Sequence, residues 1–228
     1  MTLRIGDLAP NFTAATTQGL LTLHDWMGES WVVFMSHPKD FTPICTTELG
    51  LMASLEGEFE KCGVKIMGHS VDSVVDHFRW ITDIRDTQGI EPHFPIVGDE
   101  SLEIAKLYDM LPAEAIAGPR TIAENATVRA VFIIGPDKRI KLMTFYPMSA
   151  GRNFKEVLRV IYSLQLSMKY KVATPVNWEP GAPVLIPPSV SDEEATKLFP
   201  NGWTTTKPGG GPESSQRPYL RYVSQPGR

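Results

Sequence analysis

Short apolar runs alternate along this chain with segments in which apolar residues recur every three or four positions. The run 31–35 is continuously apolar, and 64–68, 94–97 and 128–134 are similar. They are rich in β-branched and aromatic residues, which predicts strands buried on both faces. The stretch 141–146 is more mixed and is typical of an edge or one-sided strand. Helical spacing covers about 44–61, 73–87, 101–109 and 153–169. This alternation predicts an α/β layered fold.

The composition changes near Lys171. Residues 1–170 hold 21 Pro or Gly, whereas the 58 residues that follow hold 16. Because Pro and Gly interrupt regular elements, this shift predicts a compact domain over 1–168 and a loop-rich extension over 169–228. Ser191 followed by Glu194 is a helix-capping pair, so we expect one short helix in the extension.

Composition and charge exclude several classes of protein. The 228 residues are 42% hydrophobic and 21% charged, with a formal net charge of −4. These values exclude a disordered or collagen-like chain and predict no nucleic-acid partner. The longest apolar runs have five residues, so we expect no integral membrane association. Cys45 and Cys62 are the two cysteines, which favours a reducing, cytoplasmic location over a secreted disulfide scaffold.

The stretch 36–48 carries the chemistry that the sequence predicts. It follows the buried run 31–35 and leads into a helical pattern. Pro43 suits the first turn of that helix, and Thr42 is a natural N-cap. Cys45 then lies in the first turn, where unpaired backbone N–H groups and the helix dipole stabilise a thiolate. We therefore expect Cys45 to be a nucleophile.

The residues around Cys45 also resemble a known signature. Pro38, Thr42 and Cys45 form Pro-x-x-x-Thr-x-x-Cys, and Thr-Thr-Glu follows the cysteine. This pattern resembles the active site of peroxiredoxins, and His37 before the proline is similar to the 1-Cys, peroxiredoxin-6-like subfamily. The resemblance extends to 3–12, 135–138, 144–147, 151–154, 172–175 and 219–222.

The resemblance implies a thioredoxin-like fold, in which helices flank a central mixed sheet, with a C-terminal dimerisation arm. It also implies an oxidoreductase of antioxidant defence and redox homeostasis. Such a thiol peroxidase would reduce hydrogen peroxide and organic hydroperoxides, which include alkyl and phospholipid hydroperoxides. An external thiol, with glutathione as the first candidate, would recycle it. The expected assembly is a homodimer, and no cofactor is expected.

The roles implied for single residues follow the motif. Cys45 would attack the peroxide and become a sulfenic acid, while Thr42 would hydrogen-bond the peroxide and cap the helix. Pro38 would shield the thiolate from water, and Arg129 would donate hydrogen bonds to it. Glu48 and Arg152 would form an ionic brace that aims Arg129. For His37, a role in handling the sulfenic acid and a packing role remain equally open.

Neither a metal site nor an internal disulfide is expected. The remaining histidines, His24, His69, His77 and His93, show no ligand spacing. Cys62 falls on the same predicted helix as Cys45, 17 residues later, which is roughly 25 Å along a helix. A disulfide needs the Cα atoms within about 7 Å, so Cys62 is interpreted as structural.

Two alternative functions remain open. Some members of the subfamily are described as phospholipases, with a Gly-x-Ser-x-Gly segment, a His and an Asp. The matching residues are Ser30, His24 and Asp137, but Val32 stands where the final glycine belongs. Ser30 also precedes its strand, whereas a hydrolase nucleophile follows one. The other alternative is an oligomeric holdase or redox sensor.

Overall fold

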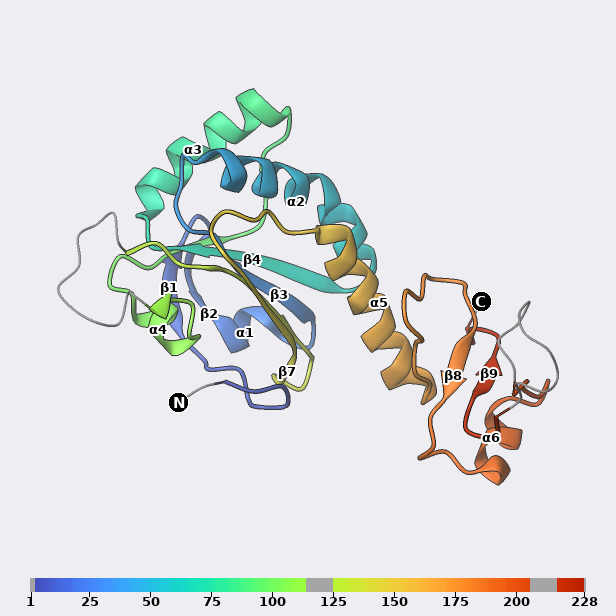
Figure 1. Ribbon diagram of the computed structural model, residues 1–228. Helices are drawn as coiled ribbons and strands as arrows, with labels where there is room; N and C mark the ends of the chain where they lie inside the picture. Colours follow the sequence, from blue (N-terminus) through green and yellow to red (C-terminus); the bar gives the residue numbers. More distant parts are fainter. Residues whose placement is uncertain (1–2, 114–124, 206–216, 228) are drawn as a thin grey trace. The chain divides into compact units, whose positions relative to one another are not determined.

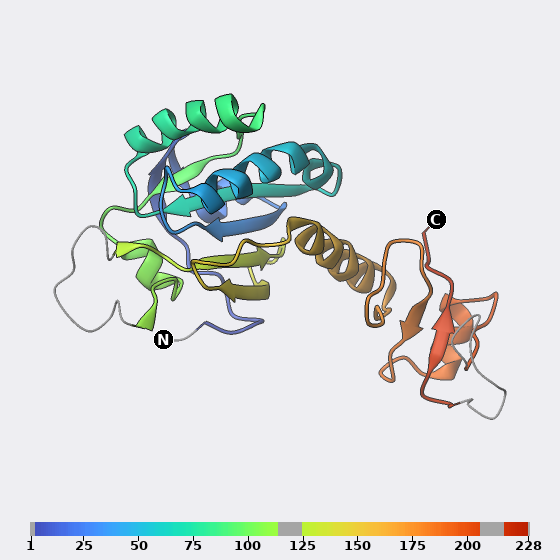
Figure 2. The same ribbon diagram turned by 45° about the horizontal axis from the view of Figure 1, so that its top comes forward.

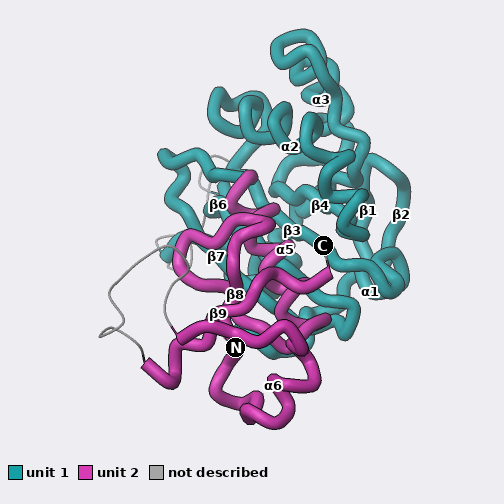
Figure 3. The backbone as a smooth tube through the Cα atoms, turned by 90° about the vertical axis from the view of Figure 1, so that its right-hand side faces the viewer, with its two compact units in different colours: residues 1–154 teal, residues 155–228 magenta. Residues whose placement is uncertain are grey.

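A seven-stranded mixed sheet forms the first of two units into which the chain divides. The computed structural model describes residues 3–113, 125–205 and 217–227. The units are Met1–Phe154 and Lys155–Arg228 (Figure 3). The strands of the large sheet are β1 (Thr13–Thr16), β2 (Gly19–Thr22), β3 (Trp31–Ser36), β4 (Val64–Ser70), β5 (Ile96–Gly98), β6 (Arg129–Ile134) and β7 (Ile140–Tyr146). The helices of the first unit are α1 (Leu23–Met27), α2 (Pro43–Lys61), α3 (Val74–Gln88) and α4 (Glu103–Leu107).

The strand order is β2-β1-β5-β4-β3-β6-β7 (Figure 1). β3 pairs in parallel with β4 and antiparallel with β6, so it is an interior strand of the sheet. Every residue of β3 and β6 is buried, as their continuous apolar sequences predict. The edge strand β7 is only partly buried, which agrees with its mixed sequence.

Helices α2 and α3 lie side by side on one face of the sheet (Figures 1 and 2). Successive side chains of a strand point to opposite faces, so β3 contributes to two layers. Val32 and Phe34 belong to a core cluster that also contains Leu23 of α1 and Ile104 of α4. The sheet is therefore covered by helices on both faces, and the loop from β3 to α2 begins at the C-terminal end of β3.

The second unit has its own small core. It consists of α5 (Phe154–Tyr170), which begins at the last residue of the first unit, then β8 (Val184–Ile186), α6 (Asp192–Leu198) and β9 (Arg221–Val223). β8 and β9 pair antiparallel, and buried residues including Trp178 and Phe199 pack between these elements. Ser191 accepts a hydrogen bond from the Glu194 N–H, which confirms the predicted cap. The two strands were not predicted.

Most other predicted elements of the first unit are confirmed, with two differences in length. The strand expected at 94–97 begins only at Ile96, because Pro95 supplies a carbonyl but no N–H to the ladder. The helix expected at 101–109 is reduced to α4, since Leu102 has a φ of 62° and cannot join it. Among the described residues, no helix is both long enough and apolar enough to span a membrane.

The composition and the contacts mark the division of the chain at different places. The Pro and Gly content rises near Lys171, whereas the contacts divide the chain after Phe154. Helix α5 lies between these two markers. Its last turns carry Leu166, which belongs to the core of the second unit.

Candidate active site

Cys45 lies in the first turn of the long helix α2, which follows the loop after β3. Thr42 occupies the N-cap position with extended backbone angles, and Pro43 is the first helical residue. The first backbone bond of the helix runs from the Thr46 N–H to the Thr42 carbonyl, 3.0 Å. The N–H groups of Ile44 and Cys45 precede that bond and have no partner within the helix. Cys45 is fully buried in this first turn.

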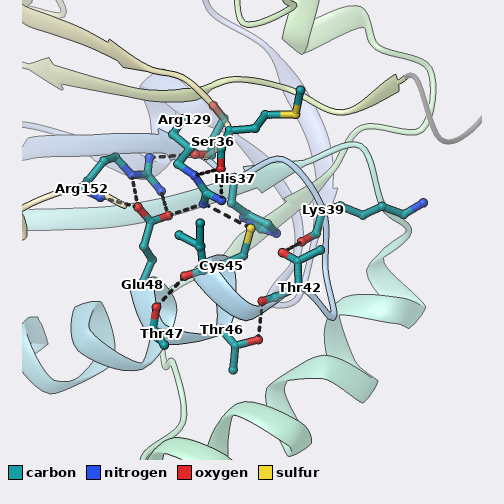
Figure 4. Close-up of polar contacts among 12 residues, drawn as sticks. Ser36, His37, Lys39, Thr42, Cys45, Thr46, Thr47, Glu48, Arg129 and Arg152 are labelled. Atoms are coloured by element: carbon teal, nitrogen blue, oxygen red, sulfur yellow. Dashed lines mark hydrogen bonds and ion pairs between the residues drawn. The ribbon is translucent and has the colours of Figure 1, made fainter. Parts of the chain in front are cut away.

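The capping role expected of Thr42 is wrong in one respect. Its hydroxyl does not accept a hydrogen bond from the helix. Instead it donates to the Lys39 carbonyl at 2.9 Å (Figure 4). Because this bond uses the hydroxyl proton, the lone pairs of Oγ1 remain available as acceptors next to the first turn of α2.

Arg129 brings a guanidinium directly to the sulfur. It is the first residue of β6, and its Nη1 lies 3.3 Å from the Cys45 Sγ. Its Nε and Nη2 both donate to the Met148 carbonyl, at 2.9 and 2.7 Å. A guanidinium held at three nitrogens has a fixed direction. The expected contact between Arg129 and Cys45 is present in the structure.

Glu48 and Arg152 hold the other side of that guanidinium. Glu48 Oε2 accepts from Arg129 Nη1 at 2.8 Å and from Arg152 Nη2 at 2.7 Å. Arg152 also donates its backbone N–H and its Nε to Glu48 Oε1, and its Nη1 to the carbonyls of Ser36 and Ala130. The ionic brace expected from the sequence is therefore formed, in the geometry drawn in Figure 4.

The brace contains more positive than negative charge. Burial alone would raise the pKa of Glu48, but hydrogen bonds and charge from Arg152, together with the charge of Arg129, lower it. Glu48 is thus a carboxylate between two guanidinium groups, all nearly inaccessible to solvent. Two buried positive charges face one buried negative charge. A thiolate at Cys45 would supply the missing negative charge, and buried charges need such partners.

Pro38 and His37 lie in the same loop. Pro38 is buried, as a group that excludes water from the sulfur should be. The His37 ring packs on Trp80 with centroids 4.8 Å apart, and its Nε2 contacts Asp40 Oδ1 at 2.6 Å. Within the parts of the chain that the structure describes, His37 makes no hydrogen bond to Cys45, and its buried Nδ1 has no partner.

The residues that could hold a metal form a cluster that the sequence spacing did not reveal. Across the described ranges, one group of three suitable side chains comes together, namely His37, Asp40 and His77, with ligand atoms within 4.8 Å of one another. Two of its N···O distances are 2.6 Å. Ligands of a tetrahedral metal with bonds of about 2.0–2.1 Å would lie about 3.3 Å apart. The observed spacing is that of strong hydrogen bonds.

Cys62 lies at the opposite end of α2 from Cys45. It is the C-cap residue, half-buried, and its thiol donates to the Glu58 carbonyl at 3.1 Å. Neither Cys45 nor Cys62 forms a disulfide. The helix that separates them is intact, as the sequence predicted, so no internal disulfide can form without unwinding it.

The three residues considered for acyl hydrolysis do not form a triad. His24 Nε2 contacts the Ala9 carbonyl, and Asp137 bonds to Lys141. Ser30 lies in the turn before β3. Among the hydrogen bonds of the described residues, none joins any two of Ser30, His24 and Asp137. The geometry gives this alternative no support.

Comparison with known proteins agrees with this geometry. Residues 5–143 match the AhpC/TSA family, and residues 163–202 match the C-terminal domain of 1-Cys peroxiredoxin. The chain is 46% identical to a 1-Cys peroxiredoxin of Dictyostelium discoideum, covering 99% of this chain and 87% of that one. It is 47% identical to human peroxiredoxin-6, covering 98% of both.

Solved structures give the same result. A mutant of the peroxiredoxin 6 of Arenicola marina superposes with a TM-score of 0.87 at 47% identity, covering 98% of this chain and 99% of that one. A yeast mitochondrial 1-Cys peroxiredoxin gives 0.84 at 45% identity, covering 98% and 100%. The fold is therefore thioredoxin-like, as expected. The chain belongs to the AhpC/TSA family and, within it, to the 1-Cys, peroxiredoxin-6-like peroxiredoxins, which are thiol peroxidases.

Proposed function

We propose that Cys45 is the peroxidatic cysteine and that Arg129, Thr42 and Pro38 complete its site. The observation that carries this assignment is the 3.3 Å contact between Arg129 Nη1 and Cys45 Sγ, within a buried cluster short of one negative charge. A thiolate there is both the nucleophile and the missing counter-charge. Glu48 and Arg152 act through Arg129, by fixing its direction.

The reaction proceeds in two stages. In the first, the Cys45 sulfur attacks the terminal oxygen of the hydroperoxide, the S–O bond forms as the O–O bond breaks, and the leaving alkoxide takes up a proton to give an alcohol. Negative charge grows on the oxygens during this step, so the fixed donors of Arg129 stabilise the transition state more than the ground state. The Thr42 hydroxyl donates its proton to the Lys39 carbonyl, so its oxygen can accept a hydrogen bond from the O–H of the hydroperoxide.

In the second stage, two external thiols reduce the sulfenic acid. The first forms a mixed disulfide with Cys45 and releases water, and the second displaces Cys45 as a free thiol. The net reaction is ROOH + 2 R′SH giving ROH, R′SSR′ and water. Because Cys45 is fully buried, the first turn of α2 must open to admit a thiol as large as glutathione.

Glutathione is the reductant we propose. Support comes from the yeast mitochondrial relative, for which thiol resolution through the glutathione and thioredoxin systems is described. The position of Cys62 at the far end of α2 also favours an external thiol. Such a thiol is abundant in the cytoplasm, where we place the protein. We further propose a homodimer to which residues 169–228 contribute, since the matched C-terminal domain is that of 1-Cys peroxiredoxins.

Chemical trapping tests the assignment. Reduced protein is treated with one equivalent of hydrogen peroxide in the presence of dimedone, which captures sulfenic acids, and the adduct is located by peptide mass spectrometry. We expect one adduct per chain, on Cys45. An adduct on Cys62 with Cys45 unmodified would overturn the proposal.

A further inference from the structure

A chain of three buried side chains runs from α3 to the active-site loop. His77 Nδ1 lies 2.6 Å from Asp40 Oδ2, and His37 Nε2 lies 2.6 Å from Asp40 Oδ1. His77 Nε2 also contacts the Val97 carbonyl of β5, at 3.1 Å. These three residues are at most 3% exposed. Both carboxylate oxygens of Asp40 are therefore occupied, each by a different imidazole.

The partners of His77 show where its protons lie. A carbonyl only accepts, so Nε2 carries a proton. A bare Nδ1 facing a bare carboxylate oxygen at 2.6 Å would be repulsive, so a proton also lies between His77 and Asp40. Imidazole is the more basic of the two groups, by about 2.5 pKa units in ordinary surroundings, so that proton belongs to His77. His77 is an imidazolium and Asp40 a carboxylate.

The pKa directions agree with this assignment. Burial would lower the pKa of His77, but the hydrogen bond and charge of Asp40 raise it, with a further contribution from Asp72. Burial would raise the pKa of Asp40, but its bonds to His37 and His77 lower it to about 2.

His37 must then be neutral. Its Nε2 donates to the acceptor Asp40 Oδ1, so the remaining question concerns Nδ1. That atom is buried and has no partner within the described chain. A proton there would create a second imidazolium beside a single carboxylate, with an unsatisfied N–H. Nδ1 is therefore a bare lone pair, and the His37 ring and the Cys45 sulfur overlap in the view of Figure 4.

We propose that His77, acting through Asp40, is a positioning residue of the peroxidase that keeps His37 neutral, with its Nδ1 lone pair ready to accept a hydrogen bond from an oxygen bound at Cys45. The proposal rests on the proposed function of Cys45. The group that fits this lone pair is the hydroxyl of the sulfenic acid formed there. His77 thus sets the hydrogen-bonding character of a site residue without touching the reacting atoms.

Loss of the His77 charge should move a proton to His37. A buried carboxylate needs one positive partner, and His37 is the remaining base in contact with Asp40. The other charged or titratable groups around His77 do not replace it. Asp72, whose Oδ2 accepts from the Asp40 N–H, is negative and favours a proton nearby. Burial lowers the pKa of His69 on β4, and that effect outweighs its bond to Asp99. Once charged, His37 would turn its Nδ1 from acceptor to donor.

Nitrogen NMR of the unaltered protein tests the proton positions without reference to activity. The histidines are labelled with 15N, and long-range 1H–15N spectra are recorded on the reduced protein at pH 7. We expect both nitrogens of His77 to be protonated and His37 to show a protonated Nε2 with a bare Nδ1. A neutral His77, or a His37 protonated at Nδ1, would overturn the proposal. Because no peroxide is involved, this result stands whether or not Cys45 proves to be peroxidatic.

A matched pair of variants tests the consequence. His77→Gln removes the proposed charge, and His69→Gln removes another fully buried histidine that is paired to a carboxylate, Asp99. The rate of Cys45 oxidation by hydrogen peroxide is measured from pH 5 to 9. In His77→Gln we expect the pH profile to contain a new one-proton step, across which the oxidation rate changes roughly tenfold. This factor corresponds to one hydrogen bond to a charged group. Its midpoint should match the titration of His37 by NMR.

The control should differ in a defined way. His69→Gln should not acquire this step in its pH profile, even if its stability falls. The double variant Asp40→Asn/His77→Gln should lose the step, because no carboxylate then requires a charged His37. Identical profiles for His77→Gln and His69→Gln would contradict the proposal. If His77→Gln does not fold, the spectrum of the unaltered protein still decides the question.

Discussion

The Nη1 of Arg129 lies 3.3 Å from the Sγ of Cys45, although 84 residues separate them in the chain. The same nitrogen also donates a hydrogen bond to Glu48, while Nε and Nη2 both donate to the Met148 carbonyl. These simultaneous hydrogen bonds require the planar guanidinium group with its several N–H donors, which lysine lacks. The contact therefore combines a positive charge with a fixed direction, and the two can be separated experimentally.

Arg129→Lys keeps the positive charge but removes the planar guanidinium group. We expect the second-order rate with hydrogen peroxide to fall about 100- to 1000-fold, the usual effect of losing a donor to a developing oxyanion. The fraction of Cys45 that is thiolate, measured by its ultraviolet absorbance, should change much less. A rate loss no greater than the loss of thiolate would show that Arg129 only ionises the sulfur.

Thr42 offers a test of the hydroxyl without a change of shape. Thr42→Val should slow the peroxide reaction about 10- to 100-fold, since one hydrogen bond to a charged or reacting group is worth about 1.5–3 kcal/mol. Thr42→Ser keeps the hydroxyl and should retain most of the rate. Because Oγ1 does not cap the helix, Thr42→Val should lower the free energy of unfolding by only about 1 kcal/mol, for the lost hydrogen bond to the Lys39 carbonyl. A large loss of stability would indicate a structural role instead.

Glu48→Gln removes the carboxylate that joins two buried guanidinium groups. Breaking such a buried pair costs about 3–5 kcal/mol, because the remaining charges lose their partner. We expect urea unfolding at pH 7 to show that the free energy of unfolding falls by this amount. The peroxidase activity should fall as well. Glu58 on the same helix makes an exposed pair with Lys61. Glu58→Gln is the control and should change neither stability nor rate appreciably.

Asp40 should make the fold sensitive to acid in a defined range. Its pKa is lowered from 3.8 to about 2, because its bonds to His37 and His77 outweigh the effect of burial. A lowered carboxyl pKa stabilises the fold above the unfolded value, and this stability, about 2 kcal/mol, is lost as the pH falls from 4 to 2. The difference in unfolding free energy between the unaltered protein and Asp40→Asn should shrink over that range. A difference that stays constant down to pH 2 would contradict the assignment.

The sequence predicted the elements whose burial is uniform. The run from Trp31 is apolar at successive positions, because β3 has a helix-covered layer on each side, and such a run has few alternatives to a buried strand. The hairpin of β1 and β2 was missed because it is short and largely exposed at the edge of the sheet. β8 and β9 have three residues each, which leaves too little pattern to detect.

The site was predicted where side chains carry a motif and missed where backbone or distant residues act. Cys45, Thr42 and Pro38 lie within eight residues of one another, and the resemblance added Arg129, Glu48 and Arg152. The Met148 carbonyl that fixes Arg129 has no side-chain signature. His77 stands 37 residues from Asp40, and only the packing of α3 brings them together. Apolar spacing predicts that helix but not its contact with Asp40.

The central claim is that one cysteine reacts with peroxide and that the chain carries no resolving partner for it. Steady-state consumption of hydrogen peroxide, with dithiothreitol as reductant, is measured for the unaltered protein, Cys62→Ser and Cys45→Ser under identical conditions. We predict equal rates for the first two and none above background for Cys45→Ser. Consumption by Cys45→Ser at the unaltered rate, or loss of turnover in Cys62→Ser, would contradict this account.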